Sequence, residues 1–407
     1  MQTQHTFRLF KTLSWAGLGL VASGLVACGG GDTSAPAGTL KLSLTDAPAC
    51  GYDHVYVTVN KIRVHQSATA DGTEVGWSEL SIPAQRIDLL SLNNGVLQEL
   101  GSLPLPAGTY QQVRLVLADN PTNPSNANPL ANALVLSGTT HEIALTTPSG
   151  QQSGYKLQAH FDVLGGQVAD MVLDFDACRS IVKAGASGRF NLKPVVSVIK
   201  RLTTAIEGYV DPSIAASVVV STRDPDNHLR ATVPDPTTGK FTLAYLPEST
   251  NYTVVVSGQN LTTAAVTNVP VSLTTGVTAL NTALTPIQPA VSATATATGV
   301  VTNVSNVPLT DAQVAARQTL STGQVLDVAT TGVDAATAGY SLTLPLAAAV
   351  KAPYVSGAAL AFTTDGMVAG RYSVIGTATG YTTQSTDPVL NLGAQDSTTV
   401  KNLVLTP

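Results

Sequence analysis

Three cysteines and a group of aspartates are the residues of this chain whose spacing suggests chemistry. Cys28 ends the stretch Leu25-Val26-Ala27-Cys28, which closes an apolar run that begins at Leu13 and follows a basic start with Arg8 and Lys11. A basic start, a short apolar run and a small residue before the cut are typical of an export signal. The run is shorter than the roughly 20 residues that a membrane span needs. We therefore expect residues 1–27 to be removed.

This start resembles that of bacterial lipoproteins, in which the cysteine sulfur receives a diacylglycerol and the signal is cut immediately before it. The resemblance implies lipidation of Cys28, with acyl chains such as palmitate, and attachment to a membrane through the N-terminal lipid. Because Gly29 is not aspartate, it also implies the outer membrane in a Gram-negative cell. The alternative is an ordinary secretory signal that is cut elsewhere, with Cys28 incidental.

Cys50 and Cys178 are the cysteines that remain once Cys28 carries lipid. In an oxidising envelope, two remaining thiols in one domain predict a disulfide. The alternatives are two buried free thiols or two metal ligands. A zinc site would need further ligands, and no nearby pair of histidines supplies them.

Three aspartates, Asp46, Asp174 and Asp176, lie close in sequence to these two cysteines. A disulfide would bring Asp46 towards the other two, and carboxylates at i and i+2 of a strand share a face. The three could therefore share a calcium ion, although calcium takes at least about six oxygen ligands. The alternative is that Asp46 caps a turn and the others are solvated edge residues. We expect no cofactor, and we keep the three as candidate calcium ligands only.

Other motifs are near misses. His141-Glu142 begins like a zinc-protease motif, but Leu145 stands where the second histidine belongs and the segment alternates like a strand. The segment Asp224–His228 hints at a calcium loop, but it lacks the glycine and the distant glutamate, so a polar hairpin turn is favoured. Motifs for nucleotide binding or for serine hydrolysis are absent from the sequence.

Composition and periodicity predict an all-β chain of β-sandwich domains in tandem after the signal peptide. Hydrophobic residues make up 44% of the chain and aromatic residues 5%, with 34 glycines and 23 prolines. Leu40, Leu42 and Leu44 alternate with polar residues, and Val55, Val57 and Val59 do the same. A net charge of −5 argues against nucleic-acid binding, which calls for clustered lysine and arginine. Further strands are expected at 75–80, 86–92, 109–117, 133–136, 141–146, 155–163, 167–174 and 190–199.

A second resemblance covers the first large domain, residues 39–202, which follows a Gly-rich tether at 28–38. The segment resembles the prokaryotic lipoprotein domain known as domain of unknown function 4382, which implies a β-rich envelope module and no known activity. The motifs that carry the resemblance are GTLKLSLTDAP at 38–48, DHVYVTV at 53–59, IRV at 62–64, GTYQQVRL at 108–115, LDFD at 173–176 and FNLKPV at 190–195.

An internal repeat follows residue 203. Each copy resembles the prealbumin-like β-sandwiches called carboxypeptidase regulatory-like, which serve as spacers or binding units on surface proteins. We expect the first copy at 203–286 and the second at 291–407, with an insertion near 345–370. The paired motifs are GYV at 208–210 and GVV at 299–301, GKFTL at 239–243 and GYSLTL at 339–344, NYTVVV at 251–256 and RYSVI at 371–375, and LTP at 284–286 and 405–407.

Two classes of function fit these features. The first is a lipid-anchored, non-catalytic binding or spacer protein of the cell envelope, whose partner is a glycan or another envelope protein. The second is an envelope hydrolase with an acidic active site in the first domain, built from Asp46, Asp174 and His160. Retaining chemistry would need two carboxyl groups roughly 5 Å apart in a cleft. We expect the first class, and therefore no enzyme.

Overall fold

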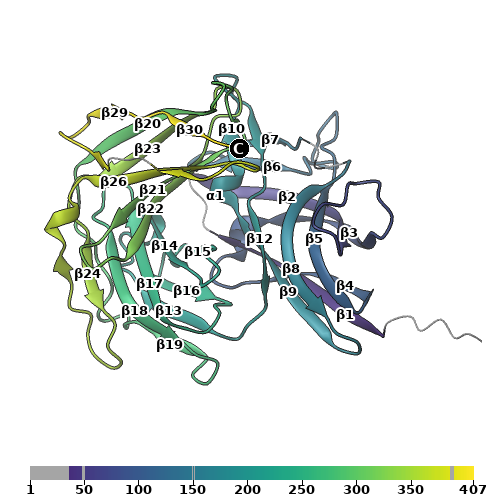
Figure 1. Ribbon diagram of the computed structural model, residues 1–407, viewed down its shortest axis with the longest axis horizontal. Helices are drawn as coiled ribbons and strands as arrows, with labels where there is room; N and C mark the ends of the chain where they lie inside the picture. Colours follow the sequence, from purple (N-terminus) through teal and green to yellow (C-terminus); the bar gives the residue numbers. More distant parts are fainter. Residues whose placement is uncertain (1–35, 48–50, 149, 151, 386–388) are drawn as a thin grey trace, which may run out of the picture. The chain divides into compact units, whose positions relative to one another are not determined.

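The chain is built almost entirely from strands. The structure is a computed structural model, and it describes residues 36–407 apart from 48–50, 149, 151 and 386–388. Its regular elements are β-strands, with one short helix, α1 (Ala177–Ser180), and three 3-10 turns (Figure 1). The predicted all-β fold of β-sandwich domains in tandem is confirmed.

The first module comprises β1 to β12. One sheet has the order β12-β9-β1-β4, and the other has the order β10-β11-β7-β6-β2-β5-β8 with β3 also paired to β2. Its strands are β1 (Ala37–Ala47), β2 (Tyr52–His65), β3 (Ser78–Asp88), β4 (Gln98–Pro106), β5 (Gly108–Leu117), β6 (Ala133–Leu136), β7 (Glu142–Thr146), β8 (Tyr155–Val163), β9 (Val168–Asp176), β10 (Ile181–Lys183), β11 (Phe190–Leu192) and β12 (Val196–Lys200).

The second module comprises β13 to β19. A three-stranded sheet, β16-β13-β19, accompanies a sheet of order β15-β14-β17-β18 that two strands of the third module extend. Its strands are β13 (Ala205–Tyr209), β14 (Val218–Arg223), β15 (Leu229–Thr232), β16 (Lys240–Ala244), β17 (Ser249–Gly258), β18 (Ala264–Val271) and β19 (Val277–Ala279).

The third module comprises β20 to β30. One sheet has the order β23-β20-β29 with β30 also on β20, and the other has the order β22-β21-β26-β27 with β28 also on β26. Its strands are β20 (Thr294–Asn303), β21 (Gln313–Thr319), β22 (Val325–Gly332), β23 (Gly339–Pro345), β24 (Val350–Pro353), β25 (Thr363–Thr364), β26 (Arg371–Thr377), β27 (Gln384–Ser385), β28 (Leu390–Asn391), β29 (Thr398–Val400) and β30 (Leu403–Leu405).

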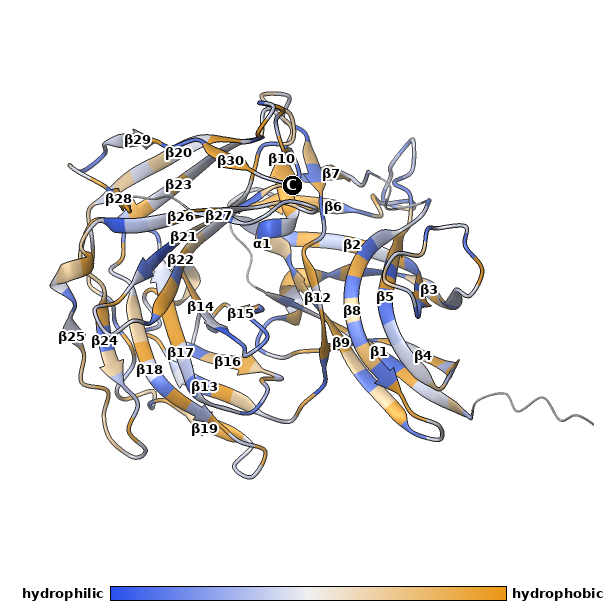
Figure 2. Cartoon of the chain, viewed as in Figure 1, coloured by the Kyte–Doolittle hydropathy of each residue, from blue (hydrophilic) through white to orange (hydrophobic). Residues whose placement is uncertain are grey.

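Alternating side chains build the core of the first module. Leu40, Leu42 and Leu44 of β1 are fully buried, as are the three alternating valines of β2. The parallel register sets Leu42 opposite Met171 and Leu44 opposite Leu173 of β9. The strands therefore present a continuous apolar row to the core, and the hydropathy pattern along them is visible in Figure 2. The predicted alternation in β1 and β2 is confirmed.

Several segments differ from the strands expected from the sequence. The strands expected at 75–80 and 86–92 form one strand, β3, and Leu89–Leu92 form a 3-10 turn that Asp88 caps. The segment 190–199 is split into β11 and β12, because Pro194 has no N–H and the amide of Lys193 bonds the carbonyl of Ser180 instead.

The strand β4, which contains Pro104 and Pro106, was not expected. It lies at the end of its sheet, where proline is tolerated.

The second and third modules share one pattern of strand pairing. In each, the first strand pairs antiparallel with a later strand and parallel with a strand near the end of the module, as β13 does with β16 and β19. In each, the second strand lies between two antiparallel neighbours, as β14 does between β15 and β17. Three of the four paired motifs therefore lie on strands with corresponding partners, whereas LTP at 284–286 lies outside the strands.

The segment 346–370 of the third module contributes to the sheet of the second. Its strand β24 pairs parallel with β18, so that Ala264 lies opposite Val350 and Thr267 opposite Pro353. Val350, Tyr354, Leu360 and Phe362 also pack against the core of the second module. The segment therefore covers the edge that β18 would otherwise expose. Among the described residues, no helix is long and apolar enough to cross a membrane.

The pairing of β24 with β18 can be tested at Ala352, which is fully buried. Ala352→Asp should lower the free energy of unfolding by about 3 kcal/mol, because a charge would be buried without a partner. Chemical denaturation measures this difference. Ala359→Asp is the control, because Ala359 is exposed in the same segment, and it should change stability by less than about 0.5 kcal/mol. Equal effects of the two variants would contradict the strand assignment.

Candidate functional site

The predicted site residues fall into three places. Cys28 and Cys50 lie outside the described residues. Cys178 lies on α1 and is partly exposed, and the disulfide with Cys50 stays a prediction. Asp46 lies on β1, and Asp174 and Asp176 lie on the neighbouring strand β9.

Asp46 is a buried carboxyl at the end of the apolar row of β1. The register places it opposite Phe175, so it continues the row of Leu42 and Leu44. Its side chain is 4% exposed, and its Oδ1 accepts a hydrogen bond from the amide of Ala177 at 3.1 Å. Its Oδ2 has no hydrogen-bond partner. Burial, and next the charge of Asp176, raise the pKa of Asp46 well above its ordinary value.

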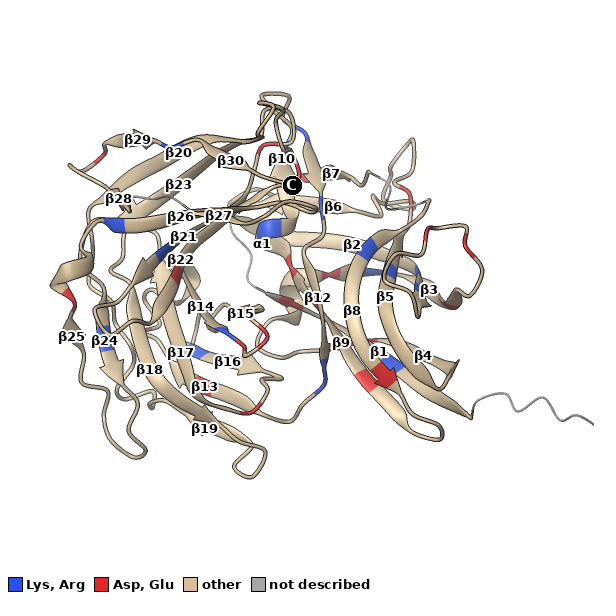
Figure 3. Cartoon of the chain, viewed as in Figure 1, with Lys and Arg blue, Asp and Glu red and all other residues tan. Residues whose placement is uncertain are grey.

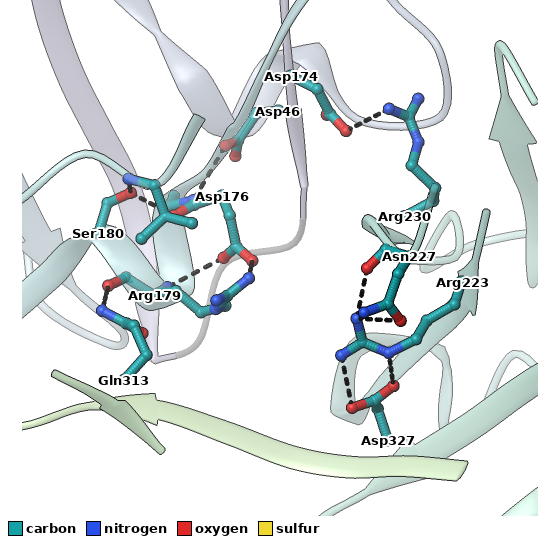
Figure 4. A network of polar contacts seen from close by, with 12 residues as sticks. Asp46, Asp174, Asp176, Arg179, Ser180, Arg223, Asn227, Arg230, Gln313 and Asp327 are labelled. Atoms are coloured by element: carbon teal, nitrogen blue, oxygen red, sulfur yellow. Dashed lines mark hydrogen bonds and ion pairs between the residues drawn. The ribbon is translucent and has the colours of Figure 1, made fainter. Parts of the chain in front are cut away.

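Asp174 and Asp176 are paired with arginines. Asp174 Oδ2 lies 3.0 Å from Nη1 of Arg230, which comes from β15 of the second module. Asp176 caps α1 by accepting the amide of Arg179 at 2.9 Å, and its Oδ2 lies 3.7 Å from Nη1 of the same arginine (Figure 4). Burial raises the pKa of both carboxyls, and the arginines oppose that shift. Their described contacts are thus guanidinium groups and amides, and the shared calcium ion stays a prediction.

A second ion cluster joins the second module to the third. The carboxylate of Asp327, on β22, accepts hydrogen bonds from Nε and Nη2 of Arg223 at 2.6 and 2.9 Å. It accepts a third from Nε of Arg317 at 2.7 Å. Burial alone would raise the pKa of Asp327, but the two guanidiniums hold it below its ordinary value. A second contact of Arg223, to the carbonyl of Asn227 at 2.7 Å, fixes the turn after β14.

Polar contacts also join the first module to both of the others. Asn94 bonds Thr232 and Thr242 of the second module. Gln313 of the third module donates to the carbonyl of Arg179 at 3.2 Å, and Asp334 accepts the amide of Gly185 at 2.8 Å. Each module therefore contacts the other two. Figure 3 shows charged residues on α1, on β15 and on β22.

Two cavities lie where the modules meet. The larger, of about 1210 Å³, is lined by consecutive residues 155–160 of β8 and 193–200 around β12, with Asp224, Asp226 and His228 on the facing side. The smaller, of about 350 Å³, is lined by Arg179, Arg223 and Arg317, together with both β9 aspartates and several hydroxyl and amide side chains. The two share His228, Gln313 and Thr377, so they are neighbours.

The residues of the hydrolase alternative do not line one cavity. His160 lines the larger cavity, Asp46 lines a third space of about 20 Å³, and Asp174 lines that space and the smaller cavity. The carboxylate of Asp174 also forms an ion pair with Arg230. The described structure therefore does not bring these three groups together as an acid, a base and a nucleophile would require.

The segment Asp224–His228 is a hairpin turn between β14 and β15, as favoured from the sequence. Asp224 accepts the amide of His228 at 2.8 Å and lies 3.2 Å from its Nδ1. Asp224, Asp226 and His228 offer ligand atoms within 4.8 Å of one another. The segment 142–146 is likewise a strand, which agrees with the rejection of a zinc-protease helix.

The arginines of the junction were not singled out from the sequence. Arg223 and Arg230 flank the polar turn, and this is the only local signal that could have pointed to them. Asp327 lies 104 residues from Arg223 and carries no motif. Only the fold brings these groups together.

Comparison with known proteins gives one domain match. Residues 37–194 match the family described as domain of unknown function (DUF4382). The resemblance expected for the first domain is thus confirmed. None of the curated proteins matches the chain.

Solved structures give only remote likenesses. The Bacillus anthracis TIE protein is 11% identical, with a TM-score of 0.19, over 91% of this chain and 51% of that chain. The major pilin BcpA of Bacillus cereus is 10% identical, with a TM-score of 0.18, over 91% and 99%. The major pilin SpaA of Corynebacterium diphtheriae is 10% identical, with a TM-score of 0.20, over 91% and 100%. The chain spans about half the length of the TIE protein, and scores this low carry no functional argument.

Asp46→Asn should stabilise the protein at neutral pH. Because the folded state raises the pKa of Asp46, the ionised carboxylate destabilises the fold above the pKa of the unfolded chain, near 4. Asparagine keeps the acceptor for Ala177 and removes the buried charge, so the free energy of unfolding at pH 7 should rise by about 1 to 2 kcal/mol. Denaturation at a series of pH values measures this gain, which should fade as the pH falls towards 4.

Asp53→Asn is the matched control. Asp53 is exposed and also accepts one backbone amide, that of Gly138 at 3.0 Å. Its replacement should give no gain at neutral pH. A loss of stability in Asp46→Asn at pH 7, or a gain that does not vary with pH, would show that the buried charge has another partner.

Proposed function

We propose that this chain is a lipid-anchored, non-catalytic binding or spacer protein of the cell envelope. The observation that carries the proposal is the junction, where three β-sandwich modules are joined by ion pairs and surround a cavity of about 1210 Å³. Fixed modules with a large shared cavity suit the binding of a glycan or an envelope protein. The residues of the hydrolase alternative line different cavities, so binding is favoured over catalysis.

The anchor is proposed at Cys28, in the outer membrane. The motif that ends in Cys28, the Gly-rich tether and the DUF4382 match at 37–194 support it. With a net charge of −5, the chain is not proposed to bind nucleic acid. We also propose that the second and third modules are two carboxypeptidase regulatory-like repeats. Their matching strand pairing supports this assignment.

The disulfide between Cys50 and Cys178 is part of the same proposal. The register places Ala47 opposite Asp176, and each cysteine follows within three residues. Backbones this close allow the short Cα separation that a disulfide needs. Non-reducing peptide mass spectrometry of the exported protein should find the linked pair. Alkylation of both cysteines without reduction would exclude the bond.

Fractionation tests the anchor. Cys28→Ser should leave the protein soluble or unprocessed, because the lipid would have no sulfur to attach to, whereas the natural chain should fractionate with the outer membrane. Cys178→Ser is the control, since it breaks the proposed disulfide without removing the lipid acceptor. Unchanged membrane retention of Cys28→Ser would refute the anchor.

A glycan array and capture of envelope proteins, both with the soluble chain from Thr39 onward, test the binding half of the proposal. Saturable binding of one class would support it. Failure of both classes would leave only the spacer role.

A further inference from the structure

The smaller cavity at the junction, called here the arginine pocket, is the feature that carries a further inference. It encloses about 350 Å³ and receives Arg179 from the first module, Arg223 from the second and Arg317 from the third. This volume lies within the range of small-molecule sites, roughly 300 to 1,000 Å³. Figure 4 shows Arg179 beside Gln313 and Arg223 beside Asp327.

The three guanidiniums differ in how many of their donor nitrogens already have partners. Arg223 uses Nε, Nη1 and Nη2 in contacts with Asp327 and Asn227. Arg317 reaches Asp327 through Nε, and its side chain is 23% exposed. Arg179 has only the 3.7 Å contact with Asp176, its Nε has no hydrogen-bond partner, and it too is 23% exposed. Arg179 and Arg317 therefore keep donors for a ligand.

The pocket is lined by charges of both signs. Arg179, Arg223 and Arg317 lie there with Asp174 and Asp176, and His228, which also lines it, is paired with the buried Asp224. Arg230 holds Asp174, and Arg223 and Arg317 hold Asp327, whereas the contact of Arg179 with Asp176 is long, at 3.7 Å. The free donors of Arg179 and Arg317 therefore favour an anionic ligand, and the planar fork of arginine matches a carboxylate.

The remaining lining combines hydroxyl and amide groups with apolar side chains. Ser197, Asn227, Thr330, Thr377 and Thr383 supply the polar groups, and Val195, Leu229, Val314, Ala315 and Ile375 supply the apolar ones. The hydroxyl and amide groups match the hydroxyls of a sugar. The larger cavity adjoins the pocket through shared residues, so a chain of sugars could continue into it.

We propose that the arginine pocket binds the carboxylate of an acidic sugar, a uronic acid within an envelope glycan, through Arg179 and Arg317. The inference rests on the proposed binding function and names the class of its ligand. Arg223 holds Asp327 and the turn after β14, and it positions Arg317 rather than contacting the sugar.

Calorimetric titration of the full chain with galacturonate and with oligogalacturonate tests the proposal. Both should bind with saturation, while neutral galactose should not. Arg179→Gln should weaken binding about tenfold, the loss expected for one hydrogen bond to a charged group. Arg179→Lys should recover part of it, because the charge is kept and the fork is lost. Arg189→Gln, which alters an exposed arginine of the same module, should bind like the natural chain.

Three results would overturn the assignment: no heat with either uronate, equal binding of galactose, or unchanged affinity in Arg179→Gln that melts like the natural chain. Saturable binding of polyglutamate in place of the uronates would assign the pocket to an acidic peptide and also overturn it. Binding of a neutral glycan that Arg179→Gln leaves intact would keep the proposed function and reject the pocket. Failure of every glycan and protein probe would instead count against the binding function itself.

Discussion

Burial of carboxylates is the constraint on which the junction of this chain depends. Asp174 and Asp327 are almost removed from water, and removing a carboxylate from water costs several kcal/mol unless a cation is placed beside it. In both cases a cation comes from another module, Arg230 for Asp174 and Arg223 for Asp327, and Arg317 of its own module also pairs with Asp327. The modules can pack closely only in arrangements that supply these partners. Charge pairing, rather than apolar area alone, therefore selects how the three sandwiches meet.

Asp46 is a carboxyl that is buried without a cation beside it. It occupies a position where a leucine would continue the core row of β1, and no guanidinium reaches it among the described residues. Its acceptor oxygen instead binds the amide of Ala177, while Asp176 binds the amide of Arg179. Two carboxyls thus fix the start of α1, the turn that carries Arg179 to the arginine pocket. The cost of burying Asp46 is offset by the orientation of this short helix.

Local patterns predicted the strands because alternate residues of each strand point to its buried face and are therefore apolar. Leu40, Leu42 and Leu44 could be assigned to a core without knowledge of their neighbours, and the turn at Asp224–His228 could be recognised from its polar residues. The partners across the junction could not be assigned in this way. Spacing placed Asp174 and Asp176 on one face, but Arg230 belongs to another module and has no sequence relation to them. Likewise, the segment 345–370 was expected only as an insertion, and nothing in its sequence identifies β18 as the neighbour of Val350.

A pocket formed by three modules is complete only while the modules are in place. Any carboxylate that bridges Arg179 and Arg317 would bind the assembled arrangement and not the separated one, so by mass action it would stabilise the assembly in proportion to its concentration and affinity. The strand β24 and the Arg223–Asp327 pair hold the second and third modules together without a ligand. Ligand affinity and the stability of the junction are therefore two measures of one equilibrium, and a change to either must appear in the other.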